Sequence, residues 1–266
     1  MKKKFVQMAL AAATAAALSA TMVLTAVAAP NFDVPSTGTV PGSGYTSQAG
    51  EYSGVGNQLM RIGIYYGSNG KSSVDLSTVT GDGFLLGYYD SQNTFVQQAS
   101  TTSLNLTVRV DPASNDAIAV YDSVGTLLYT YYTGQGEGLG IEPFSLAGTK
   151  TIVKCGYPYY GSFRFDRATA NSGQMTIVSL VRLDDYIKGV VPYEMSASWP
   201  IEALKAQAVC ARSYALSHIN ANHQRNYNFD LCDTTDCQVY QGVYSSGTSD
   251  KVNQAVEQTS GVTLMY

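Results

Sequence analysis

The acid in this sequence whose setting best suits chemistry is Glu194. Only 14% of the residues are Asp, Glu, Lys or Arg, against roughly 25% in an ordinary soluble domain. A carboxylic acid among apolar side chains tends to keep its proton near neutral pH, and it can then serve as a general acid and base. The apolar residues around it in the run VVPYEMSASW are Val190, Val191, Met195 and Trp199. The alternative is an acid that lies before a helix or joins an ion pair.

The polar residues that follow have two interpretations. Glu202 and Lys205 are three positions apart, which on a helix predicts an ion pair. Lys205 and Arg212 are seven apart and share a helix face. Because an unpaired charge is costly to bury, they either pair with acids or line a cleft and bind a polar ligand. Gln207 and Tyr214, also seven apart, share another side of the same helix.

The pattern of apolar and polar residues changes near residue 150, and the elements that position these residues come after that change. Residues 58–150 read as a small all-β region, with alternating runs such as SLNLTVRVD and turns at short spacing. Residues 151–266 read as a mixed domain, in which GQMTIVSLVRL is apolar on both faces, as in a central strand. The expected fold class is therefore α+β: an N-terminal small all-β region, then a mixed domain with a buried Ala-rich helix packed on β-strands.

Two helices are expected around Glu194. The first is the short segment DDYIKGVV, which Asp184 or Asp185 would cap and Gly189 would end. The two aspartates are expected to cap rather than to catalyse. The second helix would begin at Ser198 as its N-cap, with a proline in its first turn. Its apolar surface is formed by Leu204, Ala208, Val209, Ala211, Ala215 and Leu216, and Cys210 is expected to be a small core residue.

The first 57 residues are expected to form a signal peptide and a linker rather than part of the folded domain. Residues 1–28 combine three lysines, an apolar stretch and the triplet Ala-Val-Ala, which predicts a signal peptide cleaved after Ala28. Residues 29–57 are rich in Pro, Gly, Ser and Thr and are expected to form a flexible linker. Without the signal peptide the chain carries 13 basic and 20 acidic residues, a net charge of −7, which disfavours nucleic acid as a partner. We expect an exported protein, extracellular or in the cell-wall or septal space.

A long stretch of this sequence resembles a known family. Residues 180–216, LVRLDDYIKGVVPYEMSASWPIEALKAQAVCARSYAL, resemble the signature of the SpoIID/LytB family, the stage II sporulation protein D type of peptidoglycan-acting proteins. The segments YYGSFRF and FDLCDTTDCQVYQG resemble its flanking segments, so the resemblance covers residues 157–266. Family members continue beyond this point. The domain at 151–266 is therefore expected to be incomplete at its C-terminus.

The resemblance implies a lytic transglycosylase. Such an enzyme cuts the MurNAc–GlcNAc bond of peptidoglycan without water and leaves a 1,6-anhydro sugar, in sporulation on glycan stripped of stem peptides. The family's catalytic glutamate corresponds to Glu194. Glycoside hydrolases normally need two carboxylates, but here one suffices. It protonates the leaving oxygen and then accepts the proton of the sugar's own C6 hydroxyl, which closes the ring from within the same molecule.

The resemblance also implies a cleft, partners and no required cofactor. The partners would be peptidoglycan glycan strands and other cell-wall hydrolases. The segment DCQVYQG resembles family residues near the cleft, which adds two positions to those considered above. The expected substrate-binding residues are Lys205, Gln207, Arg212, Tyr214, Gln238 and Tyr240.

Cys232 and Cys237 have three interpretations. Some members of the family bind zinc with one His and two Cys near this segment, which corresponds here to a structural zinc on His223, Cys232 and Cys237. An exported chain also allows a disulfide, which would close a small loop between the two. Free thiols are the third alternative.

Two other functions stay open at this point. LytB-type relatives are described as enhancers of a separate amidase, so the domain could be a non-catalytic glycan-binding module or an amidase enhancer. It could also be an inert structural surface protein. The sequence contains no P-loop or Rossmann signature, and the number and positions of its histidines exclude an HExxH protease.

Overall fold

The computed structural model describes seven stretches of the chain, and several expectations fall outside them. The signal peptide, residues 29–53 of the expected linker, His223 and the chain end at Tyr266 are among the residues outside. The described residues are 54–79, 81–114, 116–144, 152–167, 173–221, 227–244 and 249–264. Among them, none of the helices is both long and apolar enough to cross a lipid bilayer.

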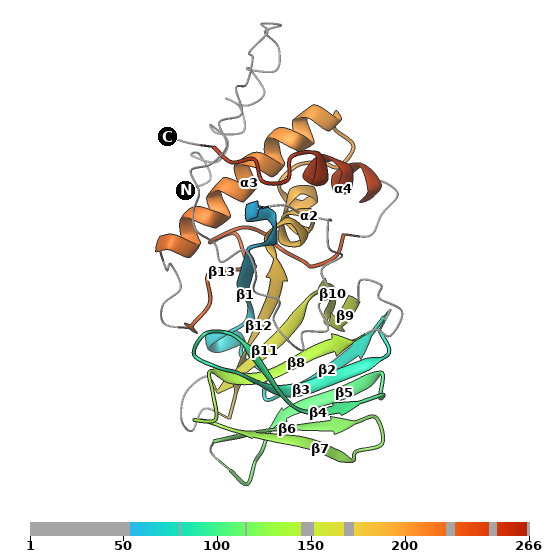
Figure 1. Ribbon diagram of the computed structural model, residues 1–266, viewed down its shortest axis with the longest axis vertical. Coiled ribbons are helices and arrows are strands. Elements are labelled where there is room, and N and C mark those ends of the chain that lie inside the picture. Colours follow the sequence, from blue (N-terminus) through green and yellow to red (C-terminus); the bar gives the residue numbers. More distant parts are fainter. Residues whose placement is uncertain are drawn as a thin grey trace, which may run out of the picture. The chain divides into compact units, whose positions relative to one another are not determined.

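The larger of two sheets runs through both halves of the described chain (Figure 1). Its strand order is β13-β1-β12-β11-β8-β3-β4, and every pair is antiparallel except β1 with β13. The strands are β1 (Leu59–Tyr65), β3 (Gly83–Tyr89), β4 (Phe95–Thr101), β8 (Gly138–Phe144), β11 (Ser162–Arg167), β12 (Met175–Arg182) and β13 (Leu231–Cys232). All of β12 except Arg182 is buried, which confirms the expectation of a central strand.

The second sheet has six strands, all antiparallel, in the order β10-β9-β2-β5-β6-β7. Its strands are β2 (Ser73–Thr78), β5 (Asn105–Val110), β6 (Ala117–Asp122), β7 (Leu127–Tyr132), β9 (Ile152–Cys155) and β10 (Tyr157–Tyr160). In β5 the alternation expected from the sequence places Leu106 and Val108 in the core, whereas Leu104 before the strand is exposed. Short 3-10 helices at η1 (Gly54–Asn57) and η2 (Gly67–Asn69) flank β1.

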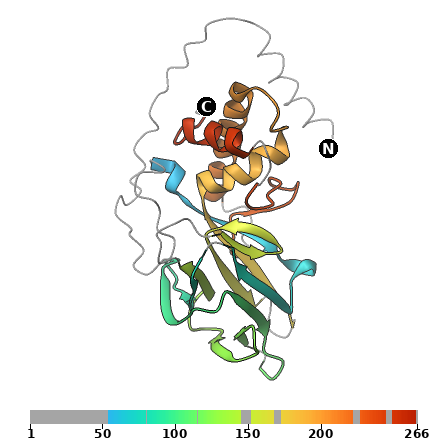
Figure 2. The same cartoon turned by 90° about the vertical axis from the view of Figure 1, so that its right-hand side faces the viewer.

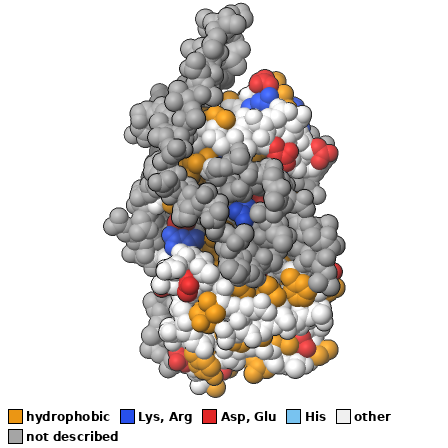
Figure 3. Space-filling view, viewed as in Figure 1, with side chains coloured by type: hydrophobic (Ala, Val, Ile, Leu, Met, Phe, Trp, Pro, Cys, Tyr) orange, Lys and Arg blue, Asp and Glu red, His pale blue; other side chains and the backbone are white. Residues whose placement is uncertain are grey.

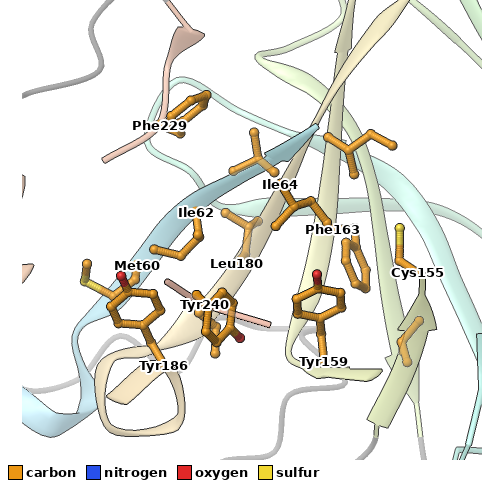
Figure 4. Packing of buried hydrophobic residues seen from close by; sticks show 14 of the residues in the cluster. Met60, Ile62, Ile64, Cys155, Tyr159, Phe163, Leu180, Tyr186, Phe229 and Tyr240 are labelled. Carbon is orange, nitrogen blue, oxygen red and sulfur yellow. The ribbon is translucent and has the colours of Figure 1, made fainter. Parts of the chain in front are cut away.

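Both sheets contain strands from either side of residue 150, where we expected a domain boundary. The larger sheet pairs β8 with β11, and the smaller sheet pairs β2 with β9. Their buried side chains form one hydrophobic cluster, part of which is shown in Figure 4. The all-β region and the mixed region are therefore joined by hydrogen-bonded strands.

Three helices gather at one end of the larger sheet (Figures 1 and 2). They are α2 (Leu183–Glu194), α3 (Ile201–Ala221) and α4 (Ser249–Gln258). With the sheets they make the α+β fold that we expected. The Ala-rich helix is α3, which packs on α2 and α4 and touches β13. Leu204, Ala208, Ala211 and Ala215 are its buried apolar side chains.

Three local expectations on the helices were wrong. Cys210 is exposed on the outer side of α3. Ser198 does not cap that helix: the helix begins at Ile201, the Pro200 carbonyl accepts its first hydrogen bonds, and the Ser198 hydroxyl meets Ser196. Gly189 does not end α2 either, because that helix continues for five residues to Glu194.

Gly189 is a glycine because another segment passes too close for a side chain. A Cβ there would overlap the carbonyl oxygen of Gly242 and lie 2.5 Å from a ring carbon of Tyr240. Gly242 itself has φ +74°, a conformation that glycine adopts without strain. The pair of glycines therefore lets the segment 238–244 lie directly on α2.

A buried ion pair ties the three helices together. Arg212 on α3 donates from Nε to Oδ1 of Asp184 on α2 at 2.8 Å, and both side chains are fully buried. Its other nitrogens donate to the carbonyls of Val262 and Val256 at 3.1 and 3.3 Å. Asp184 is thus a partner of Arg212 rather than a side-chain cap of α2.

We expect Asp184→Asn to destabilise the protein by about 3–5 kcal/mol, because it leaves the buried Arg212 guanidinium without a counter-charge. Urea denaturation measures this loss as a lower midpoint. The control is Lys205→Ala, which breaks the exposed pair with Glu202 and should cost less than about 1 kcal/mol. An unchanged midpoint for Asp184→Asn would show that the buried pair contributes nothing to stability.

Gly189→Ala should also destabilise the fold, by about 1–3 kcal/mol, because the new methyl group overpacks the contact with Gly242 and Tyr240. Helix propensity alone predicts the opposite sign, a gain of about 1 kcal/mol for Ala over Gly. A thermal melt therefore distinguishes the two effects by direction. A higher melting temperature would contradict the close contact.

Candidate functional site

Glu194 is the last residue of α2, and its side chain is exposed. One carboxylate oxygen, Oε1, accepts the backbone N–H of Val239 at 3.3 Å. That N–H belongs to the same segment that crosses Gly189 on α2. The carboxylate is thus held at the end of the helix by a neighbouring piece of backbone, with its outer side open to solvent.

We expected Glu194 to be buried among apolar side chains, and this expectation is wrong. Val190 and Val191 are fully buried, but they point into the core from the preceding turn. Met195 is half-buried, and Trp199 is exposed. Glu194 lies on the solvent-facing side of the last turn of α2, whereas the two valines lie on the side that faces the core.

Gln238 and Tyr240 hold the segment 238–244 in place from the inside. The Gln238 side chain accepts the hydroxyl of Tyr186 at 3.2 Å and donates to the carbonyl of Ala211 at 3.4 Å. The ring centroids of Tyr240 and Tyr186 are 4.8 Å apart, and Figure 4 shows the two side chains as neighbours. Both residues are buried, and their contacts with Tyr186 and Ala211 position Val239. The substrate-binding roles expected for them stay predictions.

Tyr214 on α3 is close enough to Glu194 for the carboxylate to act on its phenol. The pKa of its phenol is raised, first by partial burial, then by the Cys237 and Cys232 thiols, and then by the Glu194 carboxylate. Its ring packs against His218 at 3.9 Å between centroids. Among the expected substrate-binding residues, Tyr214 is therefore the one whose surroundings bring it near the carboxylate.

The other expected substrate-binding residues have separate environments. Lys205 pairs with Glu202 at 2.8 Å on the exposed side of α3, which confirms the expected ion pair. Gln207 is half-buried on the same helix. Arg212 is fully buried and bound to Asp184, so of its two expected roles the structure shows pairing.

The thiols of Cys232 and Cys237, which precede the segment 238–244 in the chain, lie next to each other. Their sulfur atoms are 2.9 Å apart, and the Cys232 N–H donates to the Cys237 sulfur at 3.2 Å. The hydrogen bond between the thiols lowers the pKa of Cys232. At the neighbouring Asp233, burial is the main influence, and it raises the pKa of the carboxyl group to about 7.

This pair does not have the separation that zinc requires. Two thiolates on a tetrahedral zinc, each at about 2.3 Å from the metal, lie ~3.8 Å apart, whereas these sulfurs are at 2.9 Å. Among the described residues, no three His, Cys, Asp or Glu side chains gather closely enough to hold a metal ion. His223 lies outside those residues. The described part of the site fits two neighbouring thiols better than a metal centre.

Sequence reasoning missed a group of tyrosines beside Glu194. The rings of Tyr193 and Tyr244 are 6.0 Å apart and nearly perpendicular, at 81°. Burial raises the pKa of the Tyr193 phenol, and the phenols of Tyr157 and Tyr244 raise it further. The adjacency of Tyr193 and Glu194 in the sequence was a signal, but Tyr157 and Tyr244 come from distant segments.

Comparison with known proteins identifies the part of the chain that contains this site. The family model described as "Stage II sporulation protein", SpoIID, matches residues 171–266. An uncharacterized protein of Brachyspira hyodysenteriae is 46% identical over 103 residues, which are 39% of this chain and 25% of that protein. The amidase enhancer of Bacillus subtilis is 37% identical over 131 residues, which are 49% of this chain and 17% of that protein.

The chain thus spans a quarter or less of the length of these two relatives. The matched residues include α2 with Glu194, α3, the segment 238–244 and α4. Residues 171–266, which build the candidate site, therefore belong to the SpoIID family.

Proposed function

We propose that this protein is a lytic transglycosylase that cleaves the MurNAc–GlcNAc bonds of peptidoglycan strands, with Glu194 as the general acid and base. Two findings support a role in the cell wall: the SpoIID match over the site and the similarity to a protein named amidase enhancer. The observation that carries the residue assignment is the Glu194 carboxylate itself. It is accessible to a polymer and is oriented by the Val239 N–H.

A mechanism with one carboxylate fits the neighbouring acids. Asp184 is bound to Arg212 in the core, and Asp185 is buried. Glu202 is paired with Lys205. None of these three is placed as the second carboxylate that hydrolysis by water requires, which supports attack by the sugar's own C6 hydroxyl.

The proton transfers follow from the position of Glu194. Its protonated form donates to the glycosidic oxygen as the C1–O bond breaks, and the resulting carboxylate accepts the proton of the C6 hydroxyl as that oxygen bonds to C1. The Val239 N–H at 3.3 Å restricts the carboxylate's orientation through both steps. A glycan strand lying over the exposed side chain would exclude water from it, which favours the neutral acid before the reaction.

The proposal includes the expected location and partners. Peptidoglycan lies outside the cytoplasmic membrane, so the proposed activity requires export by the expected signal peptide at residues 1–28. The glycan strands would be the substrate. Other cell-wall hydrolases would be partners in the same layer, as the name of the Bacillus subtilis relative suggests for that protein.

The second candidate is a non-catalytic amidase enhancer. It is favoured by the name of the same relative and by the exposure of Glu194, since an exposed carboxylate can also bind sugar hydroxyls without transferring a proton. The two candidates differ in one product. Only the transglycosylase makes 1,6-anhydro ends on denuded strands without another enzyme.

Glu194→Gln should reduce cleavage of denuded glycan strands by about 10²–10⁴-fold, the usual contribution of general acid–base catalysis. The amide can still accept the Val239 N–H, so fold and glycan binding should persist. Mass spectrometry of 1,6-anhydro-MurNAc ends measures the cleavage. The control is Glu202→Gln, which removes an exposed carboxylate that pairs with Lys205 and not with Val239. This variant should cleave normally.

Cleavage by Glu194→Gln at the wild-type rate would rule out the assigned role. Binding of strands by the wild type without any anhydro ends, together with stimulation of an added amidase, would favour the enhancer.

We further propose that Cys232 and Cys237 can close to a disulfide in an oxidising compartment. Exchange with a low-molecular-weight disulfide converts the two thiols into one S–S bond and releases two reduced thiols. Closing this short loop should stabilise the fold by about 2 kcal/mol. Alkylation followed by peptide mass spectrometry should find Cys232 and Cys237 protected after oxidation, while the exposed Cys210 stays reactive.

Metal analysis tests the zinc alternative on the same sample. Stoichiometric zinc that is lost in Cys232→Ser, with both thiols alkylated only after the metal is removed, would overturn the disulfide.

A further inference from the structure

The segment 238–244 places two tyrosines beside Glu194 through successive contacts with α2. Val239 meets Glu194, Gly242 meets Gly189, and Tyr244 meets Tyr193. All three contacts lie on one helix, and Tyr193 belongs to the same last turn of α2 as Glu194. The position of the pair is therefore fixed by the same packing that orients Glu194.

A third tyrosine is brought to this place by β10. The Val243 N–H donates to the carbonyl of Pro158 at 2.6 Å, and Tyr157 precedes that proline at the start of β10. Tyr157 is 50% exposed and Tyr193 is 40% exposed. Three separate pieces of chain thus contribute tyrosine rings to one surface, which we call the tyrosine platform: Tyr157, Tyr193 and Tyr244.

The chemistry of the platform suits a sugar ring. The faces of aromatic rings carry partial negative charge and attract the C–H groups of a pyranose, while phenol hydroxyls can bond sugar hydroxyls. The nearly perpendicular Tyr193 and Tyr244 rings form a corner, so a sugar stacked on one face meets the edge of the other. In the lower, described part of the face shown in Figure 3, charged side chains are sparse among hydrophobic and other polar groups.

We propose that the tyrosine platform is a subsite that binds one sugar ring of a glycan strand next to the bond facing Glu194. The inference rests on the proposed function for its choice of glycan, but it concerns binding rather than cleavage. It names residues that lie outside the substrate-binding set expected from sequence. A strand seated there would also reach the end of α2 that carries Glu194, since Tyr193 lies in the same helical turn.

Binding measured in the Glu194→Gln protein tests the platform without turnover. The probe is denuded glycan strands, with chitohexaose as a comparison that lacks the lactyl groups of MurNAc, and calorimetry gives Kd. Tyr193→Ala and Tyr244→Ala should each weaken binding about tenfold, the size that stacking on an aromatic ring gives. Tyr193→Phe keeps the ring and should stay within about threefold of the parent.

The matched control is Tyr132→Ala on β7. Tyr132 is 49% exposed, similar to Tyr157 and Tyr193, but it lies on β7, at the opposite edge of the smaller sheet from β10. It should bind strands as the parent does. In the protein with Glu194 intact, Tyr193→Ala should raise KM more than it lowers kcat.

The outcomes separate the platform from the catalytic proposal. Loss of binding in both alanine variants, without cleavage by the wild type, supports the platform and contradicts the transglycosylase. Normal binding by both alanine variants, with normal melting curves, overturns the platform even if Glu194 cleaves. Failure of the parent to bind either glycan, or equal weakening by Tyr132→Ala, overturns it as well.

Discussion

The candidate site depends on the close approach of the segment 238–244 to α2 at Gly189. Two glycines allow this contact, since a side chain at Gly189 would overlap the Gly242 carbonyl. On one side of the contact, Val239 reaches the Glu194 carboxylate, and on the other side Tyr244 reaches Tyr193. The buried pair of Arg212 and Asp184 stabilises the helices beneath. Site geometry is thus a consequence of backbone packing rather than of a rigid polar network around the acid.

The exposure of Glu194 shapes the chemistry that we propose. An acid catalyst at this exposed position needs its substrate to exclude the water around it. A polysaccharide that lies across the tyrosine platform would do so. Binding and acid catalysis would then be coupled, because the strand that is cut also creates the environment in which the acid works. The same exposure leaves the non-catalytic enhancer as the principal alternative.

The features that could be predicted from the sequence are those that residue periodicity and residue type determine. The central strand β12, the apolar face of α3 and the Glu202–Lys205 pair followed from spacing. Gly189 was misread as a helix end because the segment that passes it is 53 residues away and no local pattern reveals it. For the same reason, neither the burial of Gln238 and Tyr240 nor the approach of Tyr157 and Tyr244 to Tyr193 was foreseen.

The central claim is that a glycan strand lies over the end of α2 with a glycosidic oxygen at residue 194. A crystal structure of the Glu194→Gln protein with a denuded strand tests it most directly. The account predicts a glycosidic oxygen about 3 Å from the residue 194 side chain and a sugar ring on the Tyr193–Tyr244 corner. A strand bound elsewhere on the protein, with the end of α2 left uncovered, would contradict it.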